Sequence, residues 1–230
     1  RLWPNSKNHQ AKQFIDFGSW TLLGKTLERT KASIFDAPVI STNKKYLKQI
    51  KQHLRKYKIN NYKIVLEPAK RNTAPAILST ALIKDIPDNQ PLMFFSADHL
   101  IEKMSIFNKA INKNKKNLSD QNIFIFGIKP SSPSSEYGYF LTKKIKGNIN
   151  KVTRFIEKPK EAKAKQIIKN KGYWNSGMFY LRKDSIINNF KKYQPKTYRN
   201  CIDAVSKAKY KANTYYLSLI HISEPTRPLS

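Results

Sequence analysis

Charged residues follow two apolar runs of this sequence at the points where each run ends. Asp98 comes just after the run LMFFS, and Glu157 with Lys158 comes just after KVTRF. In open α/β sheets, ligands bind beyond the carboxyl ends of the strands, so residues at these points could do chemistry. Asp98 could be an oxygen ligand for Mg²⁺ or could cap a turn. Glu157 and Lys158 could bind sugar hydroxyls and phosphate, or could form a surface ion pair.

The segment EPAKRNTAPA predicts a helix that begins directly after a strand. Asn72 or Thr73 can cap the first turn, and Pro75 fits just inside it. The free N–H groups and positive dipole end of such a helix can hold an anion or contact the edge of a base. The same residues are also explained by a well-capped helix without a ligand.

The segment GYWNSGMF combines groups that suit close contact with a ligand, just before a predicted strand. Asn175 offers two donors and an acceptor, and Gly177 lets the backbone approach a ligand closely. A tight turn beside a buried Trp174 explains the segment as well.

The net charge of +29, from 44 Lys and Arg against 15 Asp and Glu, indicates affinity for polyanions. The lysines, however, are scattered through the predicted helices and loops and do not form one stripe with interleaved aromatic residues, as a single-strand binder would have. Two interpretations stay open: the compositional bias of an AT-rich genome, and real affinity for nucleic acid or another polyanion. We expect no specific nucleic-acid partner.

Thiol and zinc chemistry are not supported by the sequence. Cys201 is the only cysteine, so the chain can form neither an internal disulfide nor a thiolate cluster. The histidines lack the close spacing of a zinc site; they are His9, His53, His99 and His221. No arrangement of Ser, His and Asp or of Cys and His is visible for nucleophilic catalysis.

Strand-like runs alternate with segments of helical period from Ala37 onward, which is typical of a mostly parallel sheet covered by helices. Strands are expected at 37–42, 62–67, 92–99 and 122–128, and the last of these is expected to be buried on both faces. One predicted helix presents Tyr46, Leu47, Ile50 and Leu54 on one face. A second is expected to bury Ile77, Leu78, Ala81 and Leu82, and a Lys-rich helix follows the third strand.

The second half predicts shorter strands at 137–142, 151–159 and 177–183, with one helix near 162–169. No internal repeat or low-complexity linker separates the halves, so we expect them to share one sheet in a single domain. The apolar runs are far shorter than the ~20 residues of a membrane helix, and nothing resembles a signal peptide. The expected location is the cytoplasm, without a membrane partner.

The order of six motifs is more specific than any one of them. RLWP with AKQF, then EPAKRNTAPAI, SADH, FGIKPSSPSSEYGYF, FIEKP and YWNSGMF resemble the mannose-1-phosphate guanylyltransferases of the sugar-nucleotidyltransferase superfamily, over residues 1–195. The resemblance implies an α/β, Rossmann-like nucleotidyltransferase fold with a mostly parallel mixed sheet flanked by helices. It also implies transfer of GMP from GTP to mannose 1-phosphate, with Mg²⁺, giving GDP-mannose and pyrophosphate.

The resemblance assigns roles on the nucleotide side. It implies that Arg1 and Lys12 contact the triphosphate, that Asp98 binds Mg²⁺, and that Asn72 and Thr73 lie near the guanine. The sequence departs from the family's pattern at Asn5, Ala11 and Lys70, and Lys70 could crowd the base pocket.

On the sugar side, the resemblance implies that Gly138, Glu157 and Asn175 face the mannose and that Lys158 binds its phosphate. His99 follows the acid of the metal site, and we expect only a packing role for it.

Both ends of the chain bear on these expectations. In the family, a first strand and a Gly-rich loop precede the motif that begins here at Arg1, and a later Ser-Ile-Asp segment supplies a second carboxylate. We therefore expect a nucleotidyltransferase domain over 1–216 that lacks its first strand and is incomplete at both ends. The stretch 217–230 resembles a translated sequencing adapter, the alternative being a natural strand with a Pro-rich end.

Several alternatives to the full enzyme stay open. They are a non-catalytic nucleotide-binding fragment, a nucleotidyltransferase for another sugar 1-phosphate, and a polyanion-binding protein. The resemblance also leaves a homo-oligomer open.

Overall fold

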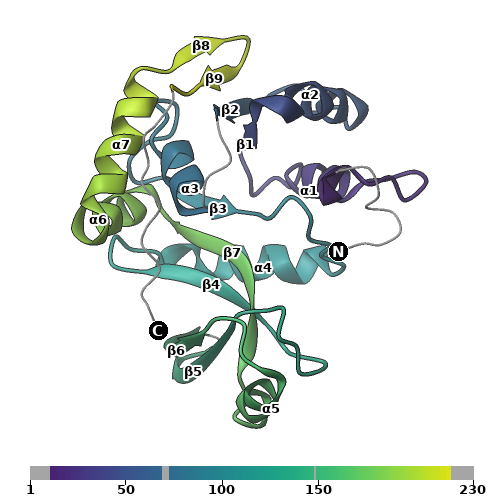
Figure 1. The fold of residues 1–230 in the computed structure, drawn as a ribbon, viewed down its shortest axis with the longest axis vertical. Helices are drawn as coiled ribbons and strands as arrows, with labels where there is room; N and C mark the ends of the chain where they lie inside the picture. Colours follow the sequence, from purple (N-terminus) through teal and green to yellow (C-terminus); the bar gives the residue numbers. More distant parts are fainter. Residues whose placement is uncertain (1–10, 69–72, 148, 219–230) are drawn as a thin grey trace. The chain divides into compact units, whose positions relative to one another are not determined.

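The computed structural model describes residues 11–68, 73–147 and 149–218, drawn as a coloured ribbon in Figure 1. The chain divides into two compact units, the first made of Arg1–Ile123 and Leu181–Ser230 and the second of Phe124–Tyr180. The strands form a four-stranded and a five-stranded sheet. The expectation that the two halves of the sequence share one sheet is wrong for the four-stranded sheet. It is confirmed for the five-stranded sheet, in which the strand expected at 122–128 pairs with the strand that contains residues 177–182.

Helices and strands alternate through most of the first unit. In chain order its elements are η2 (Lys12–Phe14), α1 (Leu22–Arg29), β1 (Val39–Asn43), η3 (Lys44–Tyr46), α2 (Leu47–Lys56), β2 (Lys63–Glu67), α3 (Thr73–Ala81), β3 (Pro91–Phe94), α4 (Met104–Asn114), η4 (Lys115–Asn117), α6 (Lys183–Tyr193), α7 (Pro195–Ser206), β8 (Lys209–Lys211) and β9 (Thr214–Tyr216). The strands expected at 37–42 and 62–67 are therefore confirmed as β1 and β2. The strand expected at 92–99 is present as β3 but ends at Phe94, before Asp98.

The four-stranded sheet has the order β1-β2-β9-β8. Strand β2 is parallel to β1 and to β9, whereas β8 and β9 form an antiparallel pair. The sheet is thus mixed and mainly parallel, as expected. The centre of β2 is apolar without interruption because both of its faces are covered: Ile64, Val65 and Leu66 are at most 3% exposed.

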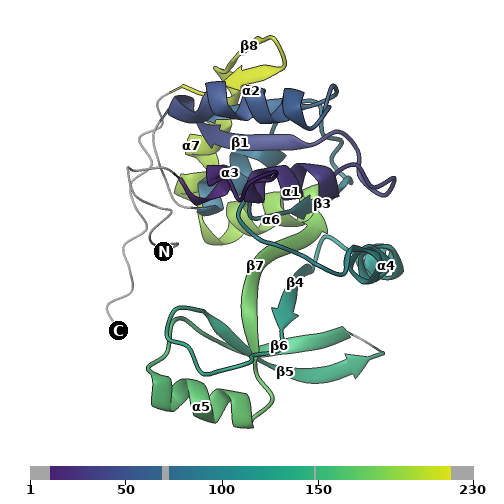
Figure 2. The same cartoon turned by 90° about the vertical axis from the view of Figure 1, so that its right-hand side faces the viewer.

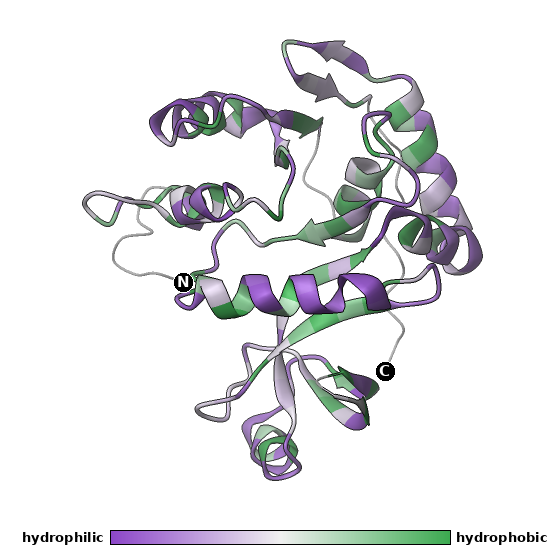
Figure 3. Cartoon of the chain, turned by 180° about the vertical axis from the view of Figure 1, so that it is seen from behind, coloured by the Kyte–Doolittle hydropathy of each residue, from purple (hydrophilic) through white to green (hydrophobic). Residues whose placement is uncertain are grey.

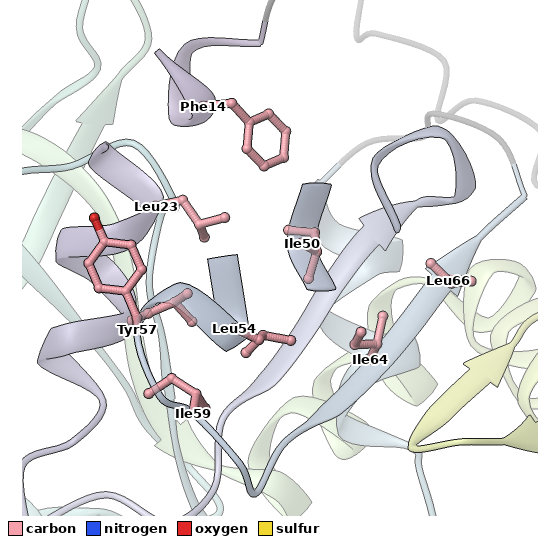
Figure 4. Close-up of a cluster of buried hydrophobic side chains, with 9 residues drawn as sticks. Phe14, Leu23, Ile50, Leu54, Tyr57, Ile59, Ile64 and Leu66 are labelled. Atoms are coloured by element: carbon pink, nitrogen blue, oxygen red, sulfur yellow. The ribbon is translucent and has the colours of Figure 1, made fainter. Parts of the chain in front are cut away.

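One face of β2 packs against α1 and α2. Ile64 and Leu66 join a cluster of buried side chains with Leu23 of α1 and with Ile50 and Leu54 of α2. Figure 4 shows this cluster, in which Phe14 of η2 also takes part. The predicted apolar face of α2 is confirmed, since Ile50 and Leu54 are buried and Tyr46 and Leu47 pack partly buried against the cluster.

The other face of β2 packs against the C-terminal part of the unit. Val65 lies in a cluster with Ile83, Tyr215 and Leu217, and the backbone N–H of Leu217 donates to the carbonyl of Leu66. Leu217 is 7% exposed. The packed core therefore includes the first residue of the stretch 217–230, one position beyond the boundary that the sequence indicated.

Helix α3 packs against α6 and α7 through a separate cluster that contains Leu78 and Cys201. Of the residues expected to be buried on α3, Leu78 and Ala81 are fully buried, whereas Ile77 and Leu82 are only half-buried. Thr80 is also buried. Its hydroxyl donates to the Ala76 carbonyl at 2.8 Å, so the buried polar group has a hydrogen-bond partner within the helix.

Helices α6 and α7 were not expected from the sequence. Their boundary does carry a local signal, since Pro195 stands at the start of α7, where a helix tolerates proline best. Cys201 on α7 is fully buried, and burial raises the pKa of its thiol. A buried thiol with a raised pKa is unreactive.

The second unit is built from antiparallel strands and one helix. Its elements are β4 (Ile123–Ile128), β5 (Tyr139–Lys146), β6 (Ile149–Ile156), α5 (Glu161–Lys169) and β7 (Tyr173–Arg182), and the last two residues of β7 belong to the first unit. Strand β5 pairs with both β6 and β7, and β4 pairs with β7. Figure 2 shows α5 beside β5 and β6.

Tyr139 is the centre of the second unit's core. It is fully buried against Ala164 and Ile167 of α5. Its hydroxyl donates to the carbonyl of Ser134 at 3.0 Å and accepts from the Ser134 N–H at 2.9 Å. Because a buried hydroxyl needs a hydrogen-bond partner, this pair fixes the loop that leads into β5.

Strand β4 differs from its expected environment. Its unbroken apolar sequence predicted burial on both faces, but Ile123 and Ile128 are 41% and 48% exposed. In the described part of the chain β4 pairs only with β7, so it has one strand neighbour and an open edge.

Figure 3 colours the ribbon by hydropathy and shows polar and apolar turns alternating along α4. Only Ile111 of this helix is fully buried. Across the described ranges, the helices all lack either the length or the apolar character needed to span a membrane.

Asp85 connects the sheet to the segment that follows α3. It accepts a hydrogen bond from Lys63 Nζ at 2.7 Å and another from the Tyr215 hydroxyl. The hydrogen bonds from Lys63 and then Tyr215 hold the pKa of Asp85 below its usual range. A carboxylate with a lowered folded-state pKa stabilises the fold above its unfolded pKa of about 4, and this stabilisation disappears as the pH falls through the lowered value.

Asp85→Asn should therefore lower the free energy of unfolding by roughly 0.5–1 kcal/mol at pH 7, which is the range for partly exposed pairs. The difference from the parent should shrink as the pH falls below about 4 and then through the lowered pKa of Asp85, where the carboxyl group becomes protonated in the folded state as well. Urea unfolding at several pH values measures it, with Asp120→Asn as the control. A difference that is equally large at acid pH would show that the charge of Asp85 is not what stabilises this contact.

Candidate functional site

Lys12 is the described residue of the predicted phosphate-binding pair. It opens η2, and its side chain is exposed. Two residues further on, Phe14 is buried, with its ring 5.3 Å from that of Tyr46 and 5.4 Å from that of His53. The packing of Phe14 therefore fixes the backbone that carries the Lys12 ammonium group.

Three further residues were expected to contact the nucleotide, namely Arg1, Asn72 and Thr73. Thr73 is the first residue of α3 and is exposed. Arg1 and Asn72 lie outside the described residues, so the structure provides no test of their roles.

Asp98 lies in a turn beyond the end of β3, outside the strand in which it was expected, and its side chain is 40% exposed. The Nε2 atom of His99 is 3.9 Å from Oδ1 of Asp98. The His99 ring is itself 38% exposed, and its backbone carbonyl accepts a hydrogen bond from Arg29 at 3.0 Å. The packing role expected for the His99 ring stays a prediction.

The carboxylates of the described residues limit the kind of metal site that the chain can form. No three His, Cys, Asp or Glu side chains come together in these ranges. Mg²⁺ at nucleotide sites is usually held through one or two carboxylates and the substrate's own phosphates. Asp98 alone fits a magnesium ion that arrives with a nucleotide, and does not fit one held by protein side chains only.

In the second unit, three predicted sugar-side residues come together. The backbone N–H of Asn175 donates to the Gly138 carbonyl at 2.8 Å. A Cβ atom added at Gly138 would lie 2.9 Å from Oε2 of Glu157, so this carboxylate lies over the glycine. The start of β5, the end of β6 and strand β7 thus bring together the backbone of Gly138, the carboxylate of Glu157 and the backbone of Asn175.

The segment WNSG lies within β7, not before it as expected. The strand is nevertheless irregular at this point, because Gly177 has a φ of +69° and its N–H donates to Oδ1 of Asn175 at 3.2 Å. A side chain would be strained at that φ. This local hydrogen bond orients the Asn175 amide so that its NH₂ group stays available.

Lys158 has a strained backbone. Its φ is +39°, which L-residues with a side chain rarely adopt. It also precedes Pro159, which is buried, and a residue before proline is normally extended. Non-glycine residues in such conformations cluster at functional sites, which is consistent with the predicted contact between Lys158 and phosphate.

Two aromatic residues beside this cluster were not identified as site residues. Tyr137 is 48% exposed, and its ring lies 4.9 Å from that of Trp174. Trp174 is half-buried and packs against Tyr139, but its indole Nε1 is buried with no hydrogen-bond partner among the described residues. Their position directly before Gly138 and Asn175 in the sequence is the signal that could have identified them.

The comparison with known families decides the classification. The sequence model of the family described as "Nucleotidyl transferase" matches residues 1–217. The chain belongs to the nucleotidyl transferase family. Its expected α/β fold, with a mainly parallel mixed sheet flanked by helices, is that of the family's solved structures.

Named relatives of this nucleotidyl transferase cover most of its length. The mannose-1-phosphate guanylyltransferase RfbM of Salmonella typhimurium is 34% identical over 211 residues, which are 89% of this chain and 44% of RfbM. The alginate biosynthesis protein AlgA of Pseudomonas fluorescens is 31% identical over 223 residues, which are 94% of this chain and 46% of AlgA. The chain therefore spans about half the length of these relatives.

A solved structure is similar as well. The crystal structure named mannose-1-phosphate geranyltransferase, from Thermus thermophilus, superimposes with a TM-score of 0.77 at 25% identity. The match covers 90% of this nucleotidyl transferase and 61% of the Thermus chain.

The strain at Lys158 can be measured in this nucleotidyl transferase. Lys158→Gly should raise the free energy of unfolding by about 0.5–1 kcal/mol, because glycine removes the left-handed penalty but adds backbone entropy to the unfolded chain. Chemical denaturation measures the change. Lys160→Gly is the matched control: Lys160 has an ordinary φ of −58°, so its replacement should destabilise. Equal losses for both variants would contradict the assignment of strain to Lys158.

Proposed function

We propose that this chain transfers GMP from GTP to mannose 1-phosphate, giving GDP-mannose and pyrophosphate. The observation that carries the proposal is that Gly138 contacts both Glu157 and Asn175, the three residues to which the family resemblance assigns contact with the sugar. The similarity to RfbM supports the choice of mannose and guanine.

The reaction demands little acid–base chemistry. An oxygen of the sugar phosphate attacks the α-phosphorus of GTP, and the bond from that phosphorus to the β-phosphate oxygen breaks to release pyrophosphate. A phosphate monoester with a second pKa near 6 is already mostly a dianion at neutral pH. The nucleophile needs no general base, which agrees with the lack of a nucleophile–base pair in the sequence.

The second unit would bind the sugar phosphate. The carboxylate of Glu157 would accept hydrogen bonds from sugar hydroxyls, and the amide NH₂ of Asn175 would donate to them. Gly138 would let the ring approach the backbone, because a side chain there would occupy the space in front of Glu157. Lys158 would pair with the phosphate.

The first unit would bind the nucleotide. Lys12 would pair with the triphosphate, and Thr73 would contact the nucleotide from the N-terminus of α3. Arg1 and Asn72, outside the described residues, keep the phosphate and guanine roles that the resemblance implies. The main task of the protein would be to hold GTP and the sugar phosphate in line for the attack. Such positioning can lower the activation free energy by about 7–11 kcal/mol.

Asp98 is the residue that would hold Mg²⁺, together with the phosphates of GTP. When bound, the ion would supply positive charge and Lewis acidity at the phosphates. The protein's own part would be to present the Asp98 carboxylate from the turn that follows β3.

Pyrophosphate release from GTP and mannose 1-phosphate tests the proposal directly. ATP, UTP and glucose 1-phosphate serve as competing substrates in the same assay. We expect the highest kcat/KM for GTP with mannose 1-phosphate. A preference for UTP with glucose 1-phosphate would contradict the proposed specificity, and lack of turnover with every pair would contradict the proposed activity.

The role of Asp98 has its own test. Asp98→Asn should lower kcat by roughly 100-fold or more, since loss of a metal ligand removes several kcal/mol of charge stabilisation. The fold should be unaffected because the side chain is exposed. Asp120→Asn is the matched control, a surface change in the same unit away from the proposed site. Turnover close to that of the parent in Asp98→Asn would rule out this carboxylate as the metal ligand.

Gly138→Ala tests the sugar side. The added methyl group should displace the flexible Glu157 side chain and press on the Phe155 ring, whose Cζ would lie 3.0 Å from it, and should raise KM for mannose 1-phosphate about tenfold. A double-mutant cycle isolates the cause. If the methyl group acts through Glu157, it should have little further effect on KM in a Glu157→Ala background. Fully additive effects would mean that Gly138 acts independently of Glu157.

A further inference from the structure

Arg29 is an unusual arginine. It is the last residue of α1 and is only 4% exposed, whereas arginine is almost never fully buried unless it is paired. Its Nη2 atom donates to the backbone carbonyl of His99 at 3.0 Å. Its Nε and Nη1 atoms are buried and have no hydrogen-bond partner among the described residues. No carboxylate in those ranges forms an ion pair with it.

The guanidinium contacts both ends of one short segment. Its central carbon lies 5.2 Å from the centroid of the Phe95 ring, and Nη2 binds the carbonyl of His99. Phe95 follows directly after β3, and Asp98 lies between these two contacts. Phe95 is held in turn by Phe35 and Phe107, whose rings lie 5.5 and 5.9 Å away. The turn that carries Asp98 is thus attached to α1 and to an aromatic cluster.

Stability alone does not account for this arginine. Burial lowers the pKa of the guanidinium, which means that the charged form is disfavoured by loss of water. Replacement of a buried charged group by an apolar one of similar volume is often neutral or stabilising. A methionine would fill much of the same space without leaving buried N–H groups unpaired.

We propose that Arg29 is a positioning residue for Asp98. It holds the segment 95–99 in one conformation, so that the Asp98 carboxylate keeps a constant orientation toward a nucleotide-bound divalent cation. An arginine is needed because the planar guanidinium can stack on Phe95 while donating in its plane to the His99 carbonyl, which a lysine cannot do. The positioning of the segment stands on the contacts alone, and its catalytic consequence rests on the proposed function.

The test uses Arg29→Met and Arg29→Lys in the full 230-residue chain, with the exposed Arg55→Met as the matched control. Hydrogen–deuterium exchange of peptides covering residues 95–100 reports on the segment whether or not the protein is active. Denaturation gives the stability. Kinetics with GTP and mannose 1-phosphate give kcat, KM and the Mg²⁺ concentration for half-maximal rate.

We expect Arg29→Met to be at least as stable as the parent, with about tenfold faster exchange over 95–100, because one hydrogen bond to a charged group is lost. The half-maximal Mg²⁺ concentration should rise about tenfold and kcat should fall by a similar factor, while KM for mannose 1-phosphate stays within about twofold. Arg29→Lys should restore only part of these losses. Arg55→Met should change none of them.

Other outcomes overturn the proposal. Unchanged exchange over 95–100 in Arg29→Met would show that Arg29 does not hold the segment. If Arg29→Met does not fold, Arg29→Lys is the deciding variant. Exchange rates over 95–100 and a Mg²⁺ dependence equal to those of the parent in Arg29→Lys would show that any buried cation is sufficient, which contradicts the proposed role of the guanidinium. If the parent makes no GDP-mannose, the proposed function fails, but the exchange data still decide whether Arg29 positions the segment.

Discussion

The burial of β2 on both faces is the constraint on which the first unit depends. Ile64, Val65 and Leu66 are almost free of solvent, so other elements must cover each side of the strand. Helices α1 and α2 cover one face, and the segment after α3 with the end of the described chain covers the other. The η2 segment is fixed by the same packing, because Phe14 belongs to the cluster that contains Ile64 and Leu66. Lys12, one of the proposed nucleotide-binding residues, thus occupies an exposed position on a backbone that the buried Phe14 holds in place.

Tyr139 has a comparable role in the second unit. Its ring fills the space between β5 and α5, and its hydroxyl closes the loop from Ser134. Gly138, immediately before it, is therefore held against Asn175 of the neighbouring strand. Because Tyr139 is held in the core and the neighbouring Gly138 has no side chain, the backbone at Gly138 can form part of the proposed sugar-binding surface. Positioning of this kind favours recognition by shape and by a few hydrogen bonds.

The sequence predicted the local elements best where the apolar pattern was regular. Strands β1 and β2 and the buried face of α2 followed from period alone. Strand β4 did not, since an apolar run does not reveal how many strand neighbours it will have. Gly138, Glu157 and Asn175 were grouped by resemblance to a family, because their spacing carries no information on tertiary contact. Arg29 had no sequence signal, since its burial and its unpaired nitrogens arise only when α1 meets the turn after β3.

The buried cysteine has a practical consequence. Cys201 is the one thiol in the sequence, and its burial and raised pKa make it a poor target for alkylating reagents. A cysteine introduced at an exposed position would then be the only site that reacts with a maleimide dye, and no native residue would have to be removed first. Fluorescent labels placed in this way on one unit at a time could follow the arrival of nucleotide and of sugar phosphate as separate optical signals.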